Sequence, residues 1–261
     1  MRSYNVRENH IEARSRRNGK SRMAEAIEKG LKTLAVAAFM LIAQKAAATP
    51  STQIWIPSTD IQAKGTYHLG IDNYFTAGTD NTWSMPTDVG LEYGVAKGWE
   101  VGFDLLGASR KPFYFNFKYG IPEKGSLPAF AAGSCFMGTS RKGASRTDID
   151  MYYALVAKTI PGVSARLSLG GYVGNGKLLV DTNGDRERTG ILASIDKQFT
   201  KKIWGAVDYQ GGENSLGAAS IGVSYAFADN VSLLVGYDFF NEKKLQPAPA
   251  NTFTTQLDIN F

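Results

Sequence analysis

The chain has a single cysteine, Cys135, and only two histidines among its 261 residues. One cysteine excludes an intramolecular disulfide and a cysteine-ligated metal cluster, so Cys135 is expected to be a small apolar strand residue. Long hydrophobic runs are also missing, because the longest, residues 34–43, is well short of the roughly 20 residues that a membrane-spanning helix needs. An exported form of the chain would therefore be stabilised by hydrogen-bonded strands and by burial.

The first 48 residues have the organisation of a secretory signal peptide. Two lysines precede the apolar run 34–43, and Ala46-Ala47-Ala48 supplies the small residues that signal peptidase accepts. We expect cleavage after Ala48 and export through the Sec pathway. Met23 is an alternative start, since it would open a signal peptide of ordinary length.

The positive charge of the chain belongs to the segment that this cleavage removes. The full sequence has a formal charge of +5, but residues 1–48 hold ten Lys/Arg and four Asp/Glu, which leaves 19 basic and 20 acidic residues. No basic stripe with interleaved aromatic residues remains after position 48. The sequence therefore predicts no nucleic-acid partner.

The C-terminal stretch, residues 251–261, alternates between apolar and polar side chains. On an extended strand Phe253, Leu257, Ile259 and Phe261 share one face, and the polar residues between them share the other. A terminal strand that ends on an aromatic residue resembles the insertion signal by which the barrel-assembly machinery recognises bacterial outer-membrane β-barrels.

The same alternation recurs from Gly65 onward and predicts an all-β fold, a transmembrane antiparallel up-and-down β-barrel of about 12 strands, with 10 or 14 as alternatives. Connections are mostly short after even strands and mostly longer and polar after odd strands, as in outer-membrane barrels with both termini in the periplasm. The expected strands are residues 65–76, 86–96, 99–108, 111–121, 127–138, 147–160, 162–174, 188–200, 202–211, 216–228, 231–242 and 251–261.

Residues 49–64 form an arm between the signal peptide and the barrel, 65–261. The arm carries an apolar spot at Ile54-Trp55-Ile56, and Pro57 argues against a central strand there. Three placements are open: a plug in the barrel, a segment at the periplasmic mouth, or a disordered segment. An arm in the bore would favour a closed barrel over an open channel.

One face of the expected strands is almost free of charge, as a lipid-facing surface requires, because a charge at the bilayer midplane costs about 2–4 kcal/mol. On strand 147–160 the alternation places Ile149, Met151, Tyr153 and Leu155 outward. Strand 127–138 does not alternate at residues 129–133, so its register is open.

The opposite face brings many acidic and few basic residues to the lumen. Unpaired charges need water, cations or partners, and a hydrated lumen supplies the first two. The alternative is a closed polar core, in which the acids pair with the bases and with Tyr114 and Tyr152. The lumen-lining acids are Asp72, Asp88, Glu92, Glu100, Asp104, Asp148, Asp150, Asp196, Asp208, Asp238 and Asp258, and the lumen-lining bases are Lys118, Lys158 and Arg166, with His68 on the same face.

The loops at the expected extracellular end lean basic. Such residues can contact lipopolysaccharide phosphates, and the alternative is a solvated loop surface. These loop residues are Arg110, Lys111, Arg141, Lys142, Arg146, Lys177, Arg186, Arg188, Lys243 and Lys244.

Two further patterns are candidate sites. Asp181, Asn183 and Asp185 place oxygen ligands at alternate positions and make a weak calcium candidate, but the stretch departs from the EF-hand pattern, and a plain turn is the alternative. His68 and Asp72 lie four residues apart on the lumen face without a nucleophile motif. The sequence therefore predicts no metal, no cofactor and no enzyme activity.

Stretches 128–133, 207–211 and 222–232 resemble a family of largely uncharacterised Gram-negative outer-membrane barrels with a porin-like character. The resemblance covers about half the chain; it implies fold and outer-membrane location and supplies no binding residues. The expected function is a narrow passive channel for small polar or cationic solutes. The alternative is a closed structural or interaction barrel whose basic loops bind lipopolysaccharide, polysaccharide or a partner protein.

Overall fold

The computed structural model describes residues 51–76, 85–107, 111–143, 145–246 and 250–261. The predicted signal peptide and the alternative start at Met23 lie outside the described residues. Within the described ranges, no helix is both long enough and apolar enough to cross a membrane.

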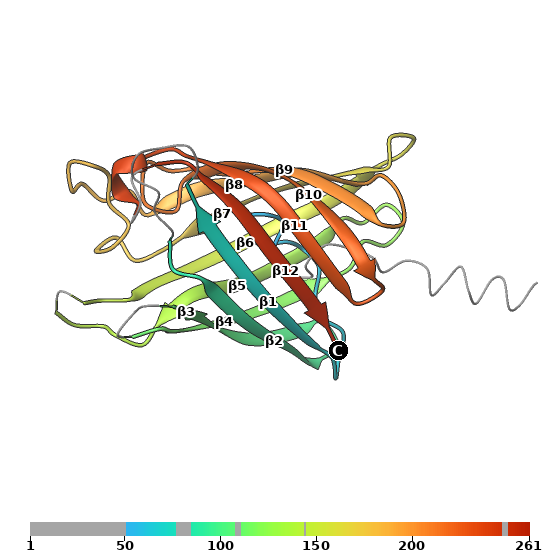
Figure 1. The fold of residues 1–261 in the computed structure, drawn as a ribbon, viewed down its shortest axis with the longest axis horizontal. Helices are drawn as coiled ribbons and strands as arrows, with labels where there is room; N and C mark the ends of the chain where they lie inside the picture. The colour runs from blue at the N-terminus through green and yellow to red at the C-terminus, as the bar shows by residue number, and fades with distance from the viewer. Residues whose placement is uncertain (1–50, 77–84, 108–110, 144, 247–249) are drawn as a thin grey trace, which may run out of the picture. The chain divides into compact units, whose positions relative to one another are not determined.

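Twelve antiparallel strands make up the described part of the chain, and pairing of the first strand with the last closes them into a barrel (Figure 1). The predicted all-β barrel of 12 strands is therefore confirmed. Apart from the closing pair, every strand pairs with its neighbours in sequence. The strands are β1 (Tyr67–Phe75), β2 (Asp88–Ala96), β3 (Trp99–Leu106), β4 (Phe113–Ile121), β5 (Ala129–Gly138), β6 (Asp148–Ile160), β7 (Ala165–Val173), β8 (Thr189–Gln198), β9 (Ile203–Gln210), β10 (Ala218–Ala228), β11 (Val231–Phe240) and β12 (Thr252–Asn260), and a short 3-10 helix, η1 (Lys243–Leu245), follows β11.

The barrel has two unlike ends. The connections after odd strands, such as residues 174–188, form what we call the outer end, and the short turns after even strands, such as residues 97–98 and 229–230, form the inner end. The start of β1 and the end of the chain after β12 meet at the inner end, where the backbone N–H of Tyr67 donates to the carbonyl of Phe261 at 2.7 Å.

The outside of the barrel is apolar. Leu169, Val223 and Phe115 are 62%, 52% and 50% exposed, and they are typical of the large apolar side chains on the odd-numbered face of their strands. An exposed apolar surface of this extent would be an aggregation liability in water, but it matches the hydrocarbon core of a bilayer.

Aromatic rings gather in two belts near the two ends of the strands. Ring pairs near the inner end are Tyr67–Tyr93, Tyr67–Phe261 and Trp99–Tyr119, with centroids 4.5, 5.6 and 4.8 Å apart. Ring pairs near the outer end are Phe75–Phe253 and Tyr237–Phe253, with centroids 5.9 and 4.8 Å apart. Girdles of this kind mark the two membrane–water interfaces of transmembrane barrels.

Strand β6 has the opposite parity from the one that the sequence predicts. Met151, Tyr153 and Leu155 are 1%, 8% and 2% exposed and point into the barrel, while Tyr152 is 49% exposed on the outside. The cause is a bulge: the pairing of β5 with β6 shifts between Cys135 and Met137, and Asp150 has a φ of 46°. One extra residue turns every following side chain to the other face.

The neighbouring tyrosines of β6 give a matched test of this parity. A tryptophan placed at the outward position, Tyr152→Trp, should lose fluorescence in liposomes whose acyl chains carry bromine, because the quencher reaches only lipid-facing rings. The same change at the inward position, Tyr153→Trp, should add fluorescence that brominated lipid does not quench. Quenching at 153 but not at 152 would restore the regular alternation and contradict the bulge.

Candidate functional site

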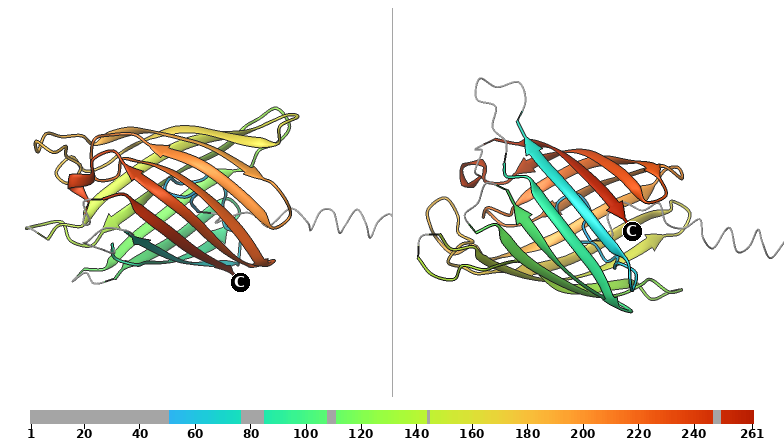
Figure 2. Two further views of the ribbon diagram at one scale, coloured as in Figure 1. Left: turned by 45° about the horizontal axis from the view of Figure 1, so that its top comes forward. Right: turned by 60° about the horizontal axis from the view of Figure 1, so that its bottom comes forward.

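The arm lies inside the barrel (Figure 2). Its residues form a small hairpin, in which Thr52 bridges to Pro57 and the backbone N–H of Gln53 donates to the carbonyl of Ile56 at 2.8 Å. Ile54 and Ile56 at the tip are 2% and 0% exposed. Of the three placements open from the sequence, the structure has the plug.

Asp208 on β9 holds the tip of this hairpin. Its Oδ2 accepts backbone N–H groups from Ile54, Trp55 and Ile56 at 2.9, 2.8 and 3.2 Å. On the other side of the hairpin, the side-chain amide of Gln256 donates to the carbonyl of Ile54 at 2.8 Å. Three successive backbone donors on one carboxylate oxygen form an anion-binding nest, in which the anion belongs to the barrel wall.

A buried ion pair of the barrel wall binds the arm at Ser51 and at Gln62. Lys118 Nζ lies 3.5 Å from Glu100 Oε1, and both side chains are 2% exposed. Lys118 also donates to the carbonyl of Ser51 at 3.1 Å, and the Glu100 carboxylate accepts the hydroxyl of Ser51 at 2.6 Å and the backbone N–H of Gln62 at 2.7 Å. The arm therefore adds hydrogen bonds to both members of this buried ion pair.

A second basic residue, Arg166 on β7, clamps the base of the arm. Its guanidinium donates to both carboxylate oxygens of Asp60 at 2.7 and 2.9 Å and to Asp196 on β8 at 3.0 Å. Gln53 donates to the same Asp196 oxygen at 3.2 Å. The fork of Arg166 thus joins the barrel wall to the arm in a bidentate geometry.

Apolar residues fill the lumen beside the arm tip. Ile56 packs in a buried cluster with Met151, Leu155, Leu192 and further residues of β5 to β8. The reversed parity of β6 supplies much of this cluster, so sequence reasoning missed it. The indole of Trp55 lies edge-on to Tyr74 and Phe240, at 5.6 and 5.3 Å between centroids, and donates to the carbonyl of Leu216 at 2.8 Å.

The other side of the lumen holds a cavity of about 550 Å³ between the arm and strands β12 and β1 to β6. It extends from Glu100, at the inner end of β3, to Leu245 in the outer-end connection. Six of the predicted acids line it: Asp72, Asp88, Glu92, Glu100, Asp104 and Asp258. We call the wall that carries them the acidic wall.

Glycines open the space in front of the acidic wall. Gly70 and Gly90 face one another across β1 and β2, and Asp258 and Asp104 flank them on the next strands. A Cβ added at Gly90 would lie 2.9 Å from an oxygen of Asp104 and 3.1 Å from an oxygen of Glu92. Two carboxylates therefore converge over a position that has no side chain of its own.

Few of these acids have a charged partner. Lys118 pairs with Glu100, and His68, 3% exposed, lies 3.5 Å from Asp258 and 3.1 Å from Asn260 rather than beside Asp72. The other bases predicted for the lumen pair with acids outside the cavity: Arg166 with Asp60 and Asp196, and Lys158 with Glu123. The cavity therefore has an excess of carboxylates.

The other predicted lumen acids lie away from the cavity. Asp238 is fully buried and accepts the hydroxyl of Thr252 at 3.2 Å, and Asp148 pairs with Arg146 near the outer end. Asp150 is a correction: at the bulge it leaves the lumen alternation and pairs with Arg141 at 2.7 Å.

Lys158 is a second correction, since it does not line the lumen. The bulge in β6 puts it on the outward parity at the inner end, where its ammonium lies 2.7 Å from Glu123. The hydrogen bond from Lys158, followed by those from Thr159, lowers the pKa of the Glu123 carboxyl to about 2.

The calcium candidate is organised as a turn. Asp181 Oδ1 accepts the backbone N–H groups of Asn183 and Asp185 at 2.8 and 2.9 Å, and Gly184 between them has a φ of 87°. The bond from Asp185 is the main cause that lowers the pKa of Asp181. No cluster of three or more metal-ligating side chains occurs in the described ranges.

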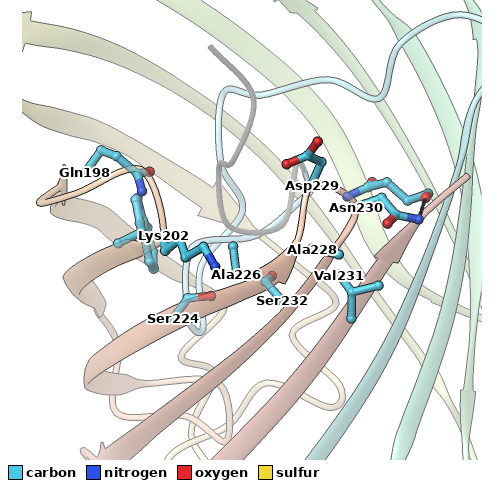
Figure 3. A pocket seen from close by; sticks show the side chains of 11 residues that line it. Gln198, Lys202, Ser224, Ala226, Ala228, Asp229, Asn230, Val231 and Ser232 are labelled. Carbon is cyan, nitrogen blue, oxygen red and sulfur yellow. Dashed lines mark hydrogen bonds between the residues drawn. The ribbon is translucent and has the colours of Figure 1, made fainter. Parts of the chain in front are cut away.

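A smaller recess lies at the inner end, between the turns that follow β8 and β10 (Figure 3). Lys202, Asp229 and Asn230 border it, and its volume of about 20 Å³ corresponds to roughly one water molecule. The recess is too small to be a ligand site.

The closed barrel, its apolar outer surface and its two aromatic belts define a transmembrane β-barrel of the outer-membrane type. No protein-family model matches the chain, and no curated protein matches it. Among solved structures, it is similar to the KdgM porin (11% identity, TM-score 0.44, 75% of this chain and 98% of the other). It is also similar to the NanC porin (9%, 0.47, 74% and 98%) and to an outer-membrane channel from Pseudomonas putida F1 (8%, 0.44, 78% and 97%). Likenesses at this level concern barrel architecture and assign no solute.

Proposed function

We propose that the barrel is a narrow passive channel for small cationic or neutral polar solutes, which pass between the arm and the acidic wall. The supporting observation is the cavity of about 550 Å³, whose acids outnumber its bases and whose lining extends from near the inner end to the outer-end connection. The arm fills the side of β7 to β11, so any path is narrow. Carboxylates along a narrow aqueous path raise the local concentration of cations and exclude anions.

The test is conductance in a planar bilayer under a salt gradient, with protein purified from outer membranes. We expect a small, cation-selective conductance. Neutralising the facing pair of β1 and β2, Asp72→Asn with Asp88→Asn, should lower the cation-to-anion permeability ratio severalfold, because these side chains oppose one another directly in the sheet. Asp185→Asn removes the same kind of charge from an outer-end turn and should change nothing.

Anion selectivity, or an unchanged ratio in the double variant, would contradict the proposal. Silence from correctly folded protein would leave the second candidate function, a closed barrel that acts through its loops. The arm, anchored by Asp208, Arg166 and the Glu100–Lys118 pair, favours that alternative. Its binding surface would be the exposed basic residues Lys177, Arg186 and Arg188, which suit phosphates of lipopolysaccharide, acidic polysaccharide or a partner protein.

Insertion into the outer membrane belongs to the same proposal. Phe253 and Phe261 of the predicted insertion signal are 39% and 62% exposed on the barrel's outer face, with Leu257 and Ile259 between them. We infer that the barrel-assembly machinery reads this stripe. Phe261 also closes the seam, because its backbone bonds to Tyr67 in both directions.

A further inference from the structure

The cavity combines two kinds of lining that a channel for inorganic ions does not need together. One part is the acidic wall, and the other is apolar and aromatic, with Trp55, Tyr74, Tyr114, Phe136 and Met151 among its residues. A volume of about 550 Å³ lies within the range of small-molecule sites, roughly 300–1,000 Å³. A bare or hydrated metal ion would leave most of this lining without a partner.

The acidic wall offers a buried carboxylate with one oxygen that lacks a hydrogen-bond partner within the described part of the chain. Glu92 is 7% exposed, and its Oε2 has no hydrogen-bond partner among the described residues. Its other oxygen converges with Asp104 over Gly90, where a Cβ would be only 2.9 and 3.1 Å from the two carboxylates. Asp104 accepts a side-chain hydrogen bond from Asn116 at 3.1 Å. A cation seated over Gly90 would contact both carboxylates and relieve their mutual repulsion.

The arm supplies the aromatic side of the site. The indole N–H of Trp55 donates to the carbonyl of Leu216. The edge-on contacts of the ring with Tyr74 and Phe240 fix the plane of the indole. A ring held in this way gives an apolar contact and a cation–π partner without losing further rotamer freedom. The same segment that narrows the lumen therefore completes a pocket.

We propose that this cavity binds an organic cation with an apolar or aromatic body, with its ammonium group over Gly90 between Glu92 and Asp104 and its body against Trp55 and the neighbouring rings. This inference rests on the proposed function, because it names the solute class for the same cavity. The binding itself does not require that the channel conducts.

The experiment is a calorimetric titration of the detergent-solubilised protein with benzylammonium, whose primary ammonium group is small enough to lie between the two carboxylates and can donate hydrogen bonds to both. We expect saturable binding, while benzoate, which has the opposite charge on a similar ring, should not bind. Glu92→Gln with Asp104→Asn should weaken binding of the cation about tenfold or more, the loss expected for charge-assisted contacts. Asp238→Asn removes a lumen acid outside the cavity and should bind like the unaltered protein.

Gly90→Ala is a second variant that keeps both charges. Its methyl group fills the position between the carboxylates, so it should also weaken binding, and heat-modifiable migration on gels will show that the barrel is folded. Equal affinity for benzylammonium in all variants, or no binding to the folded unaltered protein, would overturn the site. Selective conductance without binding would support the channel and overturn this inference. Binding without conductance would support this inference and overturn the channel.

Discussion

Removing residues 51–58 should raise the single-channel conductance of the barrel severalfold. These residues are the hairpin that lies in the lumen, and a barrel of twelve strands without it leaves more room than its own side chains fill. The freed carboxylates of Asp208 and Glu100 would then be solvated by water that enters the lumen. The comparison is made in planar bilayers, with Pro50 joined directly to Thr59 so that the strands are unchanged.

A single substitution in the barrel wall can weaken the attachment of the arm while the arm itself stays in the protein. Asp208→Asn keeps the shape of the side chain but replaces three charge-assisted bonds from the backbone of Ile54, Trp55 and Ile56 by neutral ones. Charge-assisted bonds are roughly twice as strong as neutral ones, so the arm should leave its place part of the time and give brief openings to the high-conductance level. For the variant without the hairpin, the matched control is a deletion of residues 182–185 from an outer-end turn. The conductance of this control should equal that of the unaltered protein.

An unchanged conductance in the variant without the hairpin would contradict the plug. It would mean that the path is limited by the barrel wall or by the outer-end connections. A high conductance already present in the unaltered protein would contradict it as well, because the buried tip leaves no wide path on the side of β7 to β11.

The strands and most of their faces were predictable because alternation is a local signal. The alternation within each strand indicates which of its faces contacts lipid. The difference in loop length between the two ends follows from the spacing of the strands along the sequence. The error in β6 has an equally local cause that the sequence hides. Phe136 and Asp150 have φ values of 54° and 46°. Neither residue type indicates a bulge, so the sequence pattern does not predict this one.

The sequence could not predict which lumen acids bind the arm and which line the cavity. Asp208 and Asp196 bind the arm, Asp72, Asp88 and Glu92 face the cavity, and Glu100 does both, yet all six occupy the same kind of position on an alternating strand. The distinction depends on which wall the arm follows, and that is decided by contacts more than 140 residues apart in sequence, as between Ile54 and Asp208. A single signal was present: an apolar Ile-Trp-Ile spot next to Pro57 needs a place to be buried.

The second large effect is expected from the buried ion pair of Lys118 and Glu100. Lys118→Met removes the positive partner and leaves a carboxylate that is 2% exposed without a counter-charge. Breaking a buried pair in this way typically destabilises a protein by about 3–5 kcal/mol. The measurement is reversible urea unfolding in lipid vesicles, followed by tryptophan fluorescence.

The double variant Lys118→Met with Glu100→Gln shows whether the loss comes from the unpaired charge. Glutamine keeps the acceptor oxygen for Ser51 and for the backbone of Gln62 but carries no charge, so most of the lost stability should return. Removing both members of a buried pair is commonly near neutral, because the cost of desolvating two charges disappears with them. If Lys118→Met alone costs less than about 1 kcal/mol, the pair behaves as a solvated surface pair. The lumen would then hold water around Glu100, the anchoring of the arm by this pair would be wrong, and the open path would extend to the inner end.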